Sequence, residues 1–148
     1  LYGGSPAPAV EGMVPPRPVA SVRARVVLVR DVAPGTTVGY GATHVAKGPE
    51  RWATLAIGYG EGLRRILGNR GCVLLRGRRA RMVGRISMDM TVVDVTDIPD
   101  VQAGDIATVL GTDGAEEIRV DEMAEQCGTI SYEILTGWTP RLPRVDRL

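Results

Sequence analysis

The sequence predicts a mainly β fold, a small β-barrel-like domain with one or two short helices near its C-terminus. Turn-forming residues are abundant, with 19 Gly and 10 Pro among 148 residues. Short apolar runs lie between these turn signals, a pattern typical of sandwiches and closed or partly closed barrels. A helical pattern is confined to the last thirty or so residues. With 44% hydrophobic residues, a chain of this length can bury one core.

The first predicted strand covers residues 19–30. Its alternate positions form an apolar face, made of Val22, Ala24, Val26 and Leu28. Val27 and Val29 interrupt the polar side of the alternation, so we expect both faces of the later half to be covered. Pro34-Gly35 then predicts a turn.

Later segments repeat this organisation. The further predicted strands are 52–59, 72–75, 80–86, 91–95, 106–110 and 118–120, with one helical turn at 63–67. Arg76-Gly77-Arg78 and Asp113-Gly114 predict hairpin turns. Asp121 is the predicted N-cap of a helix that ends at Gly128. Thr129 is the predicted cap of a second helix, which is expected to continue through Leu135 and end at Gly137.

The N-terminal segment differs in composition from the rest. Residues 5–18 contain five prolines, which favour a stiff, extended connector. We therefore expect residues 1–18 to be a linker and residues 19–148 to be the folded domain. Leu1-Tyr2-Gly3-Gly4 has the character of an element already under way, which suggests a piece of a longer chain.

Charge and cysteine content exclude several classes of protein. The 18 basic and 17 acidic residues nearly cancel, so no general attraction to nucleic acid or membranes is expected. Cys72 and Cys127 lie far apart in the sequence and are interpreted as free thiols. His44 is the only histidine, so we predict no metal site. The absence of a long apolar run or a secretory pattern favours a cytoplasmic protein.

An arginine cluster supports an alternative of another class. Eight arginines lie between residues 64 and 85, and on a small barrel they could follow a phosphate backbone. No aromatic residue lies within that span, although base stacking normally requires one. An arginine-rich nucleic-acid-binding module is therefore the weaker alternative.

Tyr40 lies between two glycines in Val38-Gly39-Tyr40-Gly41-Ala42-Thr43. Glycine tolerates backbone angles that other residues resist. The flanking glycines would let a ligand approach the phenol closely, or let the backbone bend so that the phenol points outward. A third interpretation is a bend in a strand whose tyrosine covers the core.

An ordered set of motifs resembles one enzyme family. The segments are Val38–Thr43, Ile57–Gly62, Val83–Asp89, Gly104-Asp105 and Thr129–Glu133. Together, in this order and spacing, they resemble the C-terminal domain of bacterial alanine racemase from about Val19 to Val145. Leu1-Tyr2-Gly3 resembles the last strand of that enzyme's N-terminal barrel.

The resemblance implies a pyridoxal 5'-phosphate-dependent racemase that interconverts L- and D-alanine. Its N-terminal α/β barrel holds the cofactor covalently on a lysine, and the C-terminal domain of the opposite subunit completes the site in a head-to-tail homodimer. A small amino acid is the implied substrate, with no nucleic acid or membrane as partner. A racemase for serine or for several amino acids is the closer alternative.

The resemblance also assigns roles to residues of this sequence. Tyr40 matches an acid/base tyrosine, and we expect it to be held rigidly on a strand. The backbone of Met88 matches a group that meets the substrate carboxylate. The other matches are Tyr132 near the cofactor phosphate, and Tyr59, Arg65, Arg85 and Asp89 at the entrance. Glu61 stands where the family usually has aspartate.

Inverting a Cα centre needs one acid/base group on each face of a planar intermediate. A tyrosine can serve one face and a lysine the other. A free phenol loses its proton only near pH ~10, so the site must lower this pKa or supply a hydrogen-bonded partner. Nearby positive charge would lower the pKa. Lys47, the only lysine, matches no cofactor lysine of the family and is interpreted as solvated. We therefore expect this chain alone to be inactive.

Overall fold

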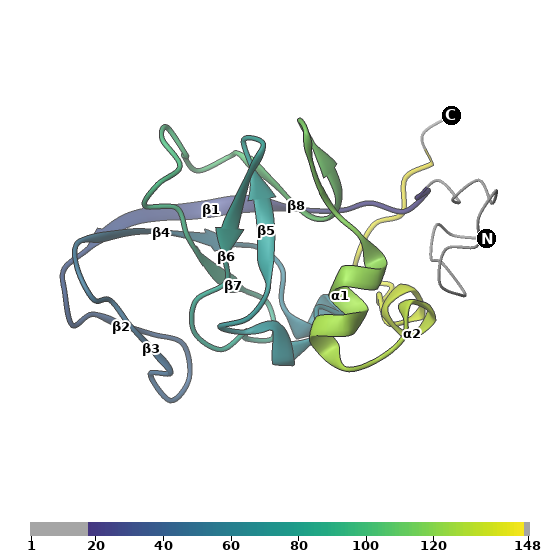
Figure 1. Cartoon of the computed structure of the whole chain (residues 1–148), viewed down its shortest axis with the longest axis horizontal. Coiled ribbons are helices and arrows are strands. Elements are labelled where there is room, and N and C mark those ends of the chain that lie inside the picture. Colours follow the sequence, from purple (N-terminus) through teal and green to yellow (C-terminus); the bar gives the residue numbers. More distant parts are fainter. Residues whose placement is uncertain (1–17, 147–148) are drawn as a thin grey trace, which may run out of the picture.

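The computed structural model describes residues 18–146, which form a strongly bent antiparallel β-sheet with two short α-helices (Figure 1). Strand β1 (Val22–Val32) is central to the sheet. Its first half pairs with β8 (Ile106–Asp113) and its second half with β4 (Glu50–Leu55). The mainly β fold predicted from the sequence is confirmed.

The remaining strands extend this sheet in both directions. They are β5 (Cys72–Leu75), β6 (Arg78–Arg81), β7 (Thr91–Asp94) and β9 (Glu116–Ile118). The order is β6-β5-β8-β1-β4-β7, with β9 paired to β8. The two ends of this path meet at a bridge between Met82 and Val93, supported by a hydrogen bond of 2.9 Å from Val83 N to Val92 O. Because a bridge and not a ladder joins them, the sheet described here is a partly closed barrel.

Two apolar clusters fill the interior. The larger one lies between the strands of the bent sheet and the two helices. The smaller cluster comprises Val32, Val38, Ala46, Trp52 and Val83. It lies beneath a separate two-stranded sheet, formed by β2 (Thr37–Val38) and β3 (His44–Val45). The β2–β3 hairpin therefore rests on its own small core at one end of the domain (Figure 1).

The predicted burial of β1 is only half correct. Val22, Ala24 and Val26 are buried, as the alternation predicts. Val27 and Leu28 are both exposed, however, although the sequence favours coverage of both faces here. The register between β1 and β4 shifts between Val26 and Leu28, and such a bulge breaks the two-residue alternation.

The helices lie close to their predicted positions. Helix α1 (Val120–Cys127) begins after Arg119 and not at the predicted Asp121, which lies in its first turn with Glu122. Acidic residues are favourable there as well as at the cap, so the composition misplaced the start by two residues. Gly128 ends the helix at φ 68°, as predicted. Helix α2 (Ser131–Thr136) begins after Ile130, one residue later than predicted, and is followed by Gly137.

No helix among residues 18–146 has the length and apolar character required to cross a bilayer. Both cysteines are free and half-buried. Burial raises the pKa of each thiol.

The linker and barrel tail expected at residues 1–18 lie outside the described residues, apart from Pro18.

An ion pair ties the β5–β6 turn to the loop before β8. Arg76 Nε lies 3.0 Å from Asp105 Oδ2, and the Gln102 amide donates to the same oxygen at 3.1 Å. These hydrogen bonds hold the pKa of the Asp105 carboxyl below its usual value, against the opposing effect of burial. A carboxyl group whose pKa is lowered on folding stabilises the fold at pH values above its unfolded-state pKa, about 3.9. This stabilisation is lost as the pH falls through the lower pKa of the folded state.

We predict that Asp105→Asn lowers the free energy of unfolding at pH 7 and that this deficit shrinks as the pH falls from about 5 to 2. Urea unfolding measured across this range would test it. Asp97→Asn, at an exposed site after β7, is the matched control and should leave the pH profile unchanged. If Asp105→Asn lowers the free energy of unfolding by the same amount at every pH, the ionised Asp105 carboxylate is not the source of the stabilisation.

Candidate functional site

Tyr40 lies in the turn between β2 and β3, and not on a strand as expected from the sequence. Its side chain is 68% exposed, so the phenol is not packed into its own domain. Gly39 and Gly41 adopt φ values of 75° and 74°, a region that favours glycine. The flanking glycines thus serve a tight turn that carries the phenol outward.

The same turn packs closely against the segment that contains Arg85. A Cβ atom placed on Gly39 would lie 2.8 Å from Arg85 N, and one on Gly41 would lie 2.8 Å from Arg85 Nη1. The Arg85 guanidinium also donates to Tyr40 O at 3.4 Å. Gly39 is therefore required by this backbone contact as well as by the turn, whereas the atom closest to Gly41 belongs to the mobile end of the Arg85 side chain. The structure brings the Tyr40 turn and Arg85 together.

Asn69 holds the other side of the turn. Its Nδ2 donates to Thr43 Oγ1 at 3.1 Å, and its Oδ1 accepts from Gly84 N at 2.6 Å. One amide side chain therefore joins the end of the Tyr40 turn to the residue before Arg85. The sequence analysis did not identify Asn69. Its only signal was its place in a Gly-Asn turn, and here Asn69 adopts a φ of 62°.

The segments that contain Tyr59 and Met88 are joined through their backbones. Tyr59 begins a 3₁₀ turn (Tyr59–Glu61), and its N–H donates to Ser87 O at 3.0 Å. Gly60 N donates to Met88 O at 2.8 Å. A Cβ on Gly58 would lie 2.2 Å from Ser87 O and 2.4 Å from Met88 O. Glycine at position 58 is what lets these two segments approach so closely, with the side chains of Tyr59 and Met88 both exposed.

A buried carboxylate and a C-terminal arginine fix this contact. Glu61 is 8% exposed, and its Oε2 accepts from Gly58 N at 2.8 Å. Arg141 Nε lies 2.9 Å from Glu61 Oε1, and Arg141 also pairs with Asp89. The hydrogen bond to Asp89 raises the pKa of Arg141. Asp89, predicted at the entrance, thus also secures the Met88 turn, through an arginine that the sequence analysis missed.

Arg65 and Tyr132 lie beside this region on different elements. Arg65 starts a second 3₁₀ turn (Arg65–Leu67) and is exposed. Tyr132 is an exposed residue of α2. That helix is docked by Arg64, whose Nη2 lies 2.9 Å from Glu133 O and 3.1 Å from Glu133 Oε1. The structure thus links the helix that carries Tyr132 to the segment that follows Tyr59.

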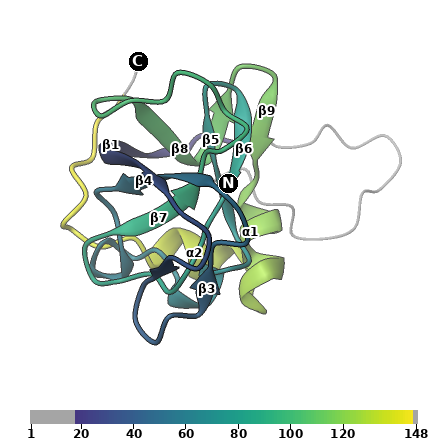
Figure 2. The same ribbon diagram turned by 90° about the vertical axis from the view of Figure 1, so that its left-hand side faces the viewer.

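Seen from two directions, the β2–β3 hairpin and helix α2 both lie toward the lower side of the sheet (Figures 1 and 2). The loops that carry Tyr59 and Met88 connect to both of them through the contacts described above. These contacts connect the segments that carry the residues selected from the sequence. Three exposed phenols are among these residues, together with the exposed arginines Arg65 and Arg85.

The described residues offer limited means of holding a cofactor or metal. Residues 18–146 contain no grouping of three or more His, Cys, Asp or Glu side chains that could hold a metal ion. Lys47, the only lysine of the sequence, is exposed in the loop between β3 and β4. The exposed groups that these segments offer to a ligand are phenols, guanidinium groups and backbone groups.

Comparison with known proteins assigns the family. A model of the alanine racemase C-terminal domain matches residues 19–146. The chain belongs to this family. An alanine racemase from Halothermothrix orenii is 42% identical over 97% of the chain, which spans 38% of that relative's length.

Solved structures of alanine racemases share this domain's fold. The biosynthetic alanine racemase from Pseudomonas aeruginosa superposes with a TM-score of 0.85 and 38% identity, over 97% of this chain and 39% of that one. The enzyme from Bartonella henselae, described with covalently bound pyridoxal phosphate, has a TM-score of 0.84 and 34% identity, over 91% of this chain and 37% of that one. The racemase family that the sequence motifs resemble is thereby confirmed.

The close contact at Gly58 predicts a large effect of a single methyl group. Gly58→Ala should lower the free energy of unfolding by about 1–3 kcal/mol, because the methyl group would force Ser87 and Met88 to shift. Gly48→Ala is a matched control, since nothing lies within 4 Å of the position that its methyl group would take, and it should leave the stability unchanged. Equal urea midpoints for the two variants would contradict the contact.

Proposed function

We propose that this chain is the substrate-completing domain of a pyridoxal 5'-phosphate-dependent alanine racemase. In this proposal a longer, cytoplasmic protein carries an N-terminal barrel, and the domain completes the opposite subunit's site in a head-to-tail homodimer. The observation that carries the proposal is the exposed Tyr40 phenol, held on an anchored turn in a chain of this family.

The residues present fit a cofactor that is held by another part of the protein. The exposed phenols and arginines can surround a ligand, but the single lysine lies on an exposed loop. A lysine of the barrel would therefore hold the cofactor, as the covalent attachment in the Bartonella enzyme suggests. When bound, pyridoxal phosphate supplies the electron sink that stabilises negative charge at Cα. By itself, this chain would hold no cofactor covalently and racemise nothing.

Tyr40 would hold or accept the proton on one face of the substrate's Cα. The two-sided exchange needs groups on opposite faces, and a phenol that projects from one domain can meet a substrate held by another. A tight turn braced by Arg85 and Asn69 gives this phenol the fixed placement that proton transfer demands. Arg85 also supplies a positive charge next to the turn.

The other residues would bind and enclose the substrate. A carboxylate needs a donor, so the N–H is the backbone group of Met88 suited to bind it, because the Met88 carbonyl already accepts from Gly60. Tyr59 and Tyr132 would narrow the site, Tyr132 near the cofactor phosphate. Arg65, Arg85 and Asp89 would line the entrance, and the two arginines would attract a carboxylate.

The arginine cluster gives little support to a nucleic-acid-binding role. Arg64 pairs with Glu133, Arg76 with Asp105, and Arg79 with both Glu116 and Glu122. These arginines, with their partner carboxylates, join strands, turns and helices of the domain. Charges neutralised in this way contribute little to phosphate binding, and the racemase proposal needs only Arg65 and Arg85.

In the full-length enzyme, Tyr40→Phe should reduce the racemisation rate by about 10²–10⁴-fold, the usual worth of one acid/base group. Absorbance of the bound cofactor should be unchanged, because the phenol does not hold it. Tyr59→Phe removes a phenolic hydroxyl from a binding role and should change KM more than kcat. Equal loss of activity and cofactor in Tyr40→Phe would show that Tyr40 is structural.

A further inference from the structure

The hairpin that carries Tyr40 is too small to hold its own position. Strands β2 and β3 contribute two residues each and form a sheet separate from the main one. Isolated two-stranded hairpins are marginally stable in water. The position of the phenol must therefore be fixed by contacts between the hairpin and the rest of the domain, including those with Arg85 and Asn69.

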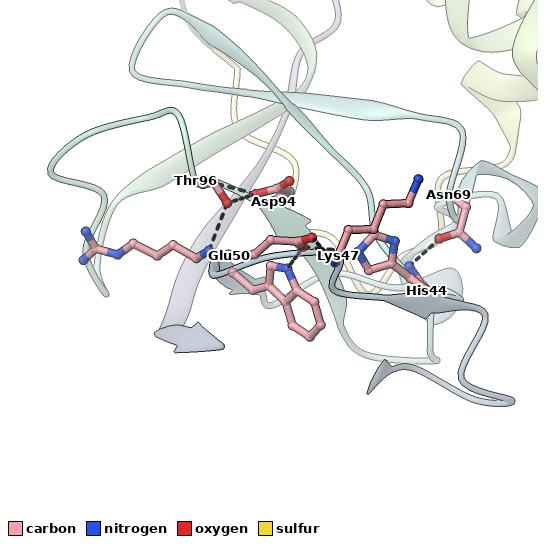
Figure 3. A network of polar contacts seen from close by, with 9 residues as sticks. His44, Lys47, Glu50, Asn69, Asp94 and Thr96 are labelled. Carbon is pink, nitrogen blue, oxygen red and sulfur yellow. Dashed lines mark hydrogen bonds and ion pairs between the residues drawn. The ribbon is translucent and has the colours of Figure 1, made fainter. Parts of the chain in front are cut away.

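Glu50 makes such a contact from the first residue of β4. Its Oε2 lies 3.3 Å from His44 Nε2, and His44 is the β3 residue that pairs with Val38 across the hairpin. Its Oε1 accepts from Lys47 N at 3.0 Å, which closes the loop between the hairpin and β4 (Figure 3). One carboxylate on the main sheet thus holds both the hairpin and the loop that follows it.

Trp52 holds the Glu50 carboxylate in place. Its Nε1 donates to Glu50 Oε2 at 2.7 Å, while its ring, 1% exposed, fills the small core beneath the hairpin. His44 packs its ring edgewise on the same indole, with centroids 5.6 Å apart. Arg30 covers the indole at 5.4 Å. Burial of Glu50 opposes its ionisation, but hydrogen bonds from Trp52, Lys47 and His44 outweigh this and lower the pKa of the carboxyl.

We infer that Glu50 is a positioning residue for Tyr40. It acts through His44 and Trp52, which fix the hairpin against the main sheet so that the turn presents the phenol in one place. The link to catalysis rests on the proposed racemase function; the link to hairpin rigidity does not. None of the motifs that resemble the racemase family contains Glu50 or Trp52, so the inference concerns residues that those motifs leave without a role.

The experiment compares Glu50→Gln with Asp94→Asn in the full-length protein. Glutamine keeps the size of Glu50 but leaves at least one of its three donors without an acceptor. Asp94 is a matched carboxylate, in register with Trp52 on β7, that accepts hydrogen bonds from the backbone and hydroxyl of Thr96 and not from the hairpin (Figure 3). His44→Phe is a milder second variant, which keeps a ring on Trp52 and removes the donor.

Hydrogen exchange is the first readout. In Glu50→Gln, amides of residues 38–45 should exchange at least about tenfold faster relative to those of β1 and β8, with a smaller increase in His44→Phe. Asp94→Asn should leave this ratio unchanged. A ratio in Glu50→Gln and His44→Phe that equals that of Asp94→Asn would overturn the inference. Should Glu50→Gln fail to fold, His44→Phe alone decides this readout.

Alanine turnover is the second readout. Glu50→Gln should lower kcat several-fold while KM and bound-cofactor absorbance stay within about twofold of wild type, since the phenol and not the binding groups is displaced. Faster hairpin exchange with an unchanged kcat would refute the catalytic link. If the wild-type enzyme does not racemise alanine, the proposed function fails, and the exchange readout still decides whether Glu50 fixes the hairpin.

Discussion

The arrangement of the site depends on one backbone contact, in which segment 58–60 lies directly against Ser87 and Met88. Gly58 makes it possible, because any side chain at this position would collide with the carbonyl oxygens of the opposite segment. From this contact the other parts extend in two directions. The Tyr40 turn packs on the residues just before Ser87, and helix α2 is docked by Arg64, just after the 3₁₀ turn. These contacts join the separate loops into one framework.

Polar side chains hold this framework together. Glu61 and Arg141 lock the contact at Tyr59 and Met88, while Glu50 and Asn69 brace the hairpin. In each place a carboxylate or amide joins segments that have little regular backbone pairing of their own. Side chains with no proposed catalytic role thus determine where the exposed phenols and arginines lie. This division suits the proposed function, in which the domain would present groups to a neighbouring subunit.

Period-two alternation and turn residues were sufficient to predict most of the β-strands, the turns near Gly77 and Gly114, and the C-terminal ends of both helices, but not the β2–β3 hairpin. They could not predict the bulge after Val26, because a bulge reflects pairing with β4 and leaves no mark on local composition. The outward position of Tyr40 follows from its two glycines. Arg141 and Glu50 were not identified from the sequence, because their hydrogen-bond partners depend on the folded structure. Arg141 pairs with Asp89, 52 residues away in the sequence, and Glu50 accepts from the indole of Trp52, two residues away.

In the proposed enzyme, Tyr40 acts in the site of the opposite subunit. Mixed dimers test it directly, by combining a full-length Tyr40→Phe subunit with one whose barrel lacks the cofactor lysine. Each parent should be inactive, but a hybrid dimer contains one site with both groups intact, so activity should return on mixing, to at most half of wild type per hybrid dimer. If Tyr40 serves its own subunit, neither hybrid site is complete, and mixtures that form hybrid dimers without any recovered racemisation would contradict the account.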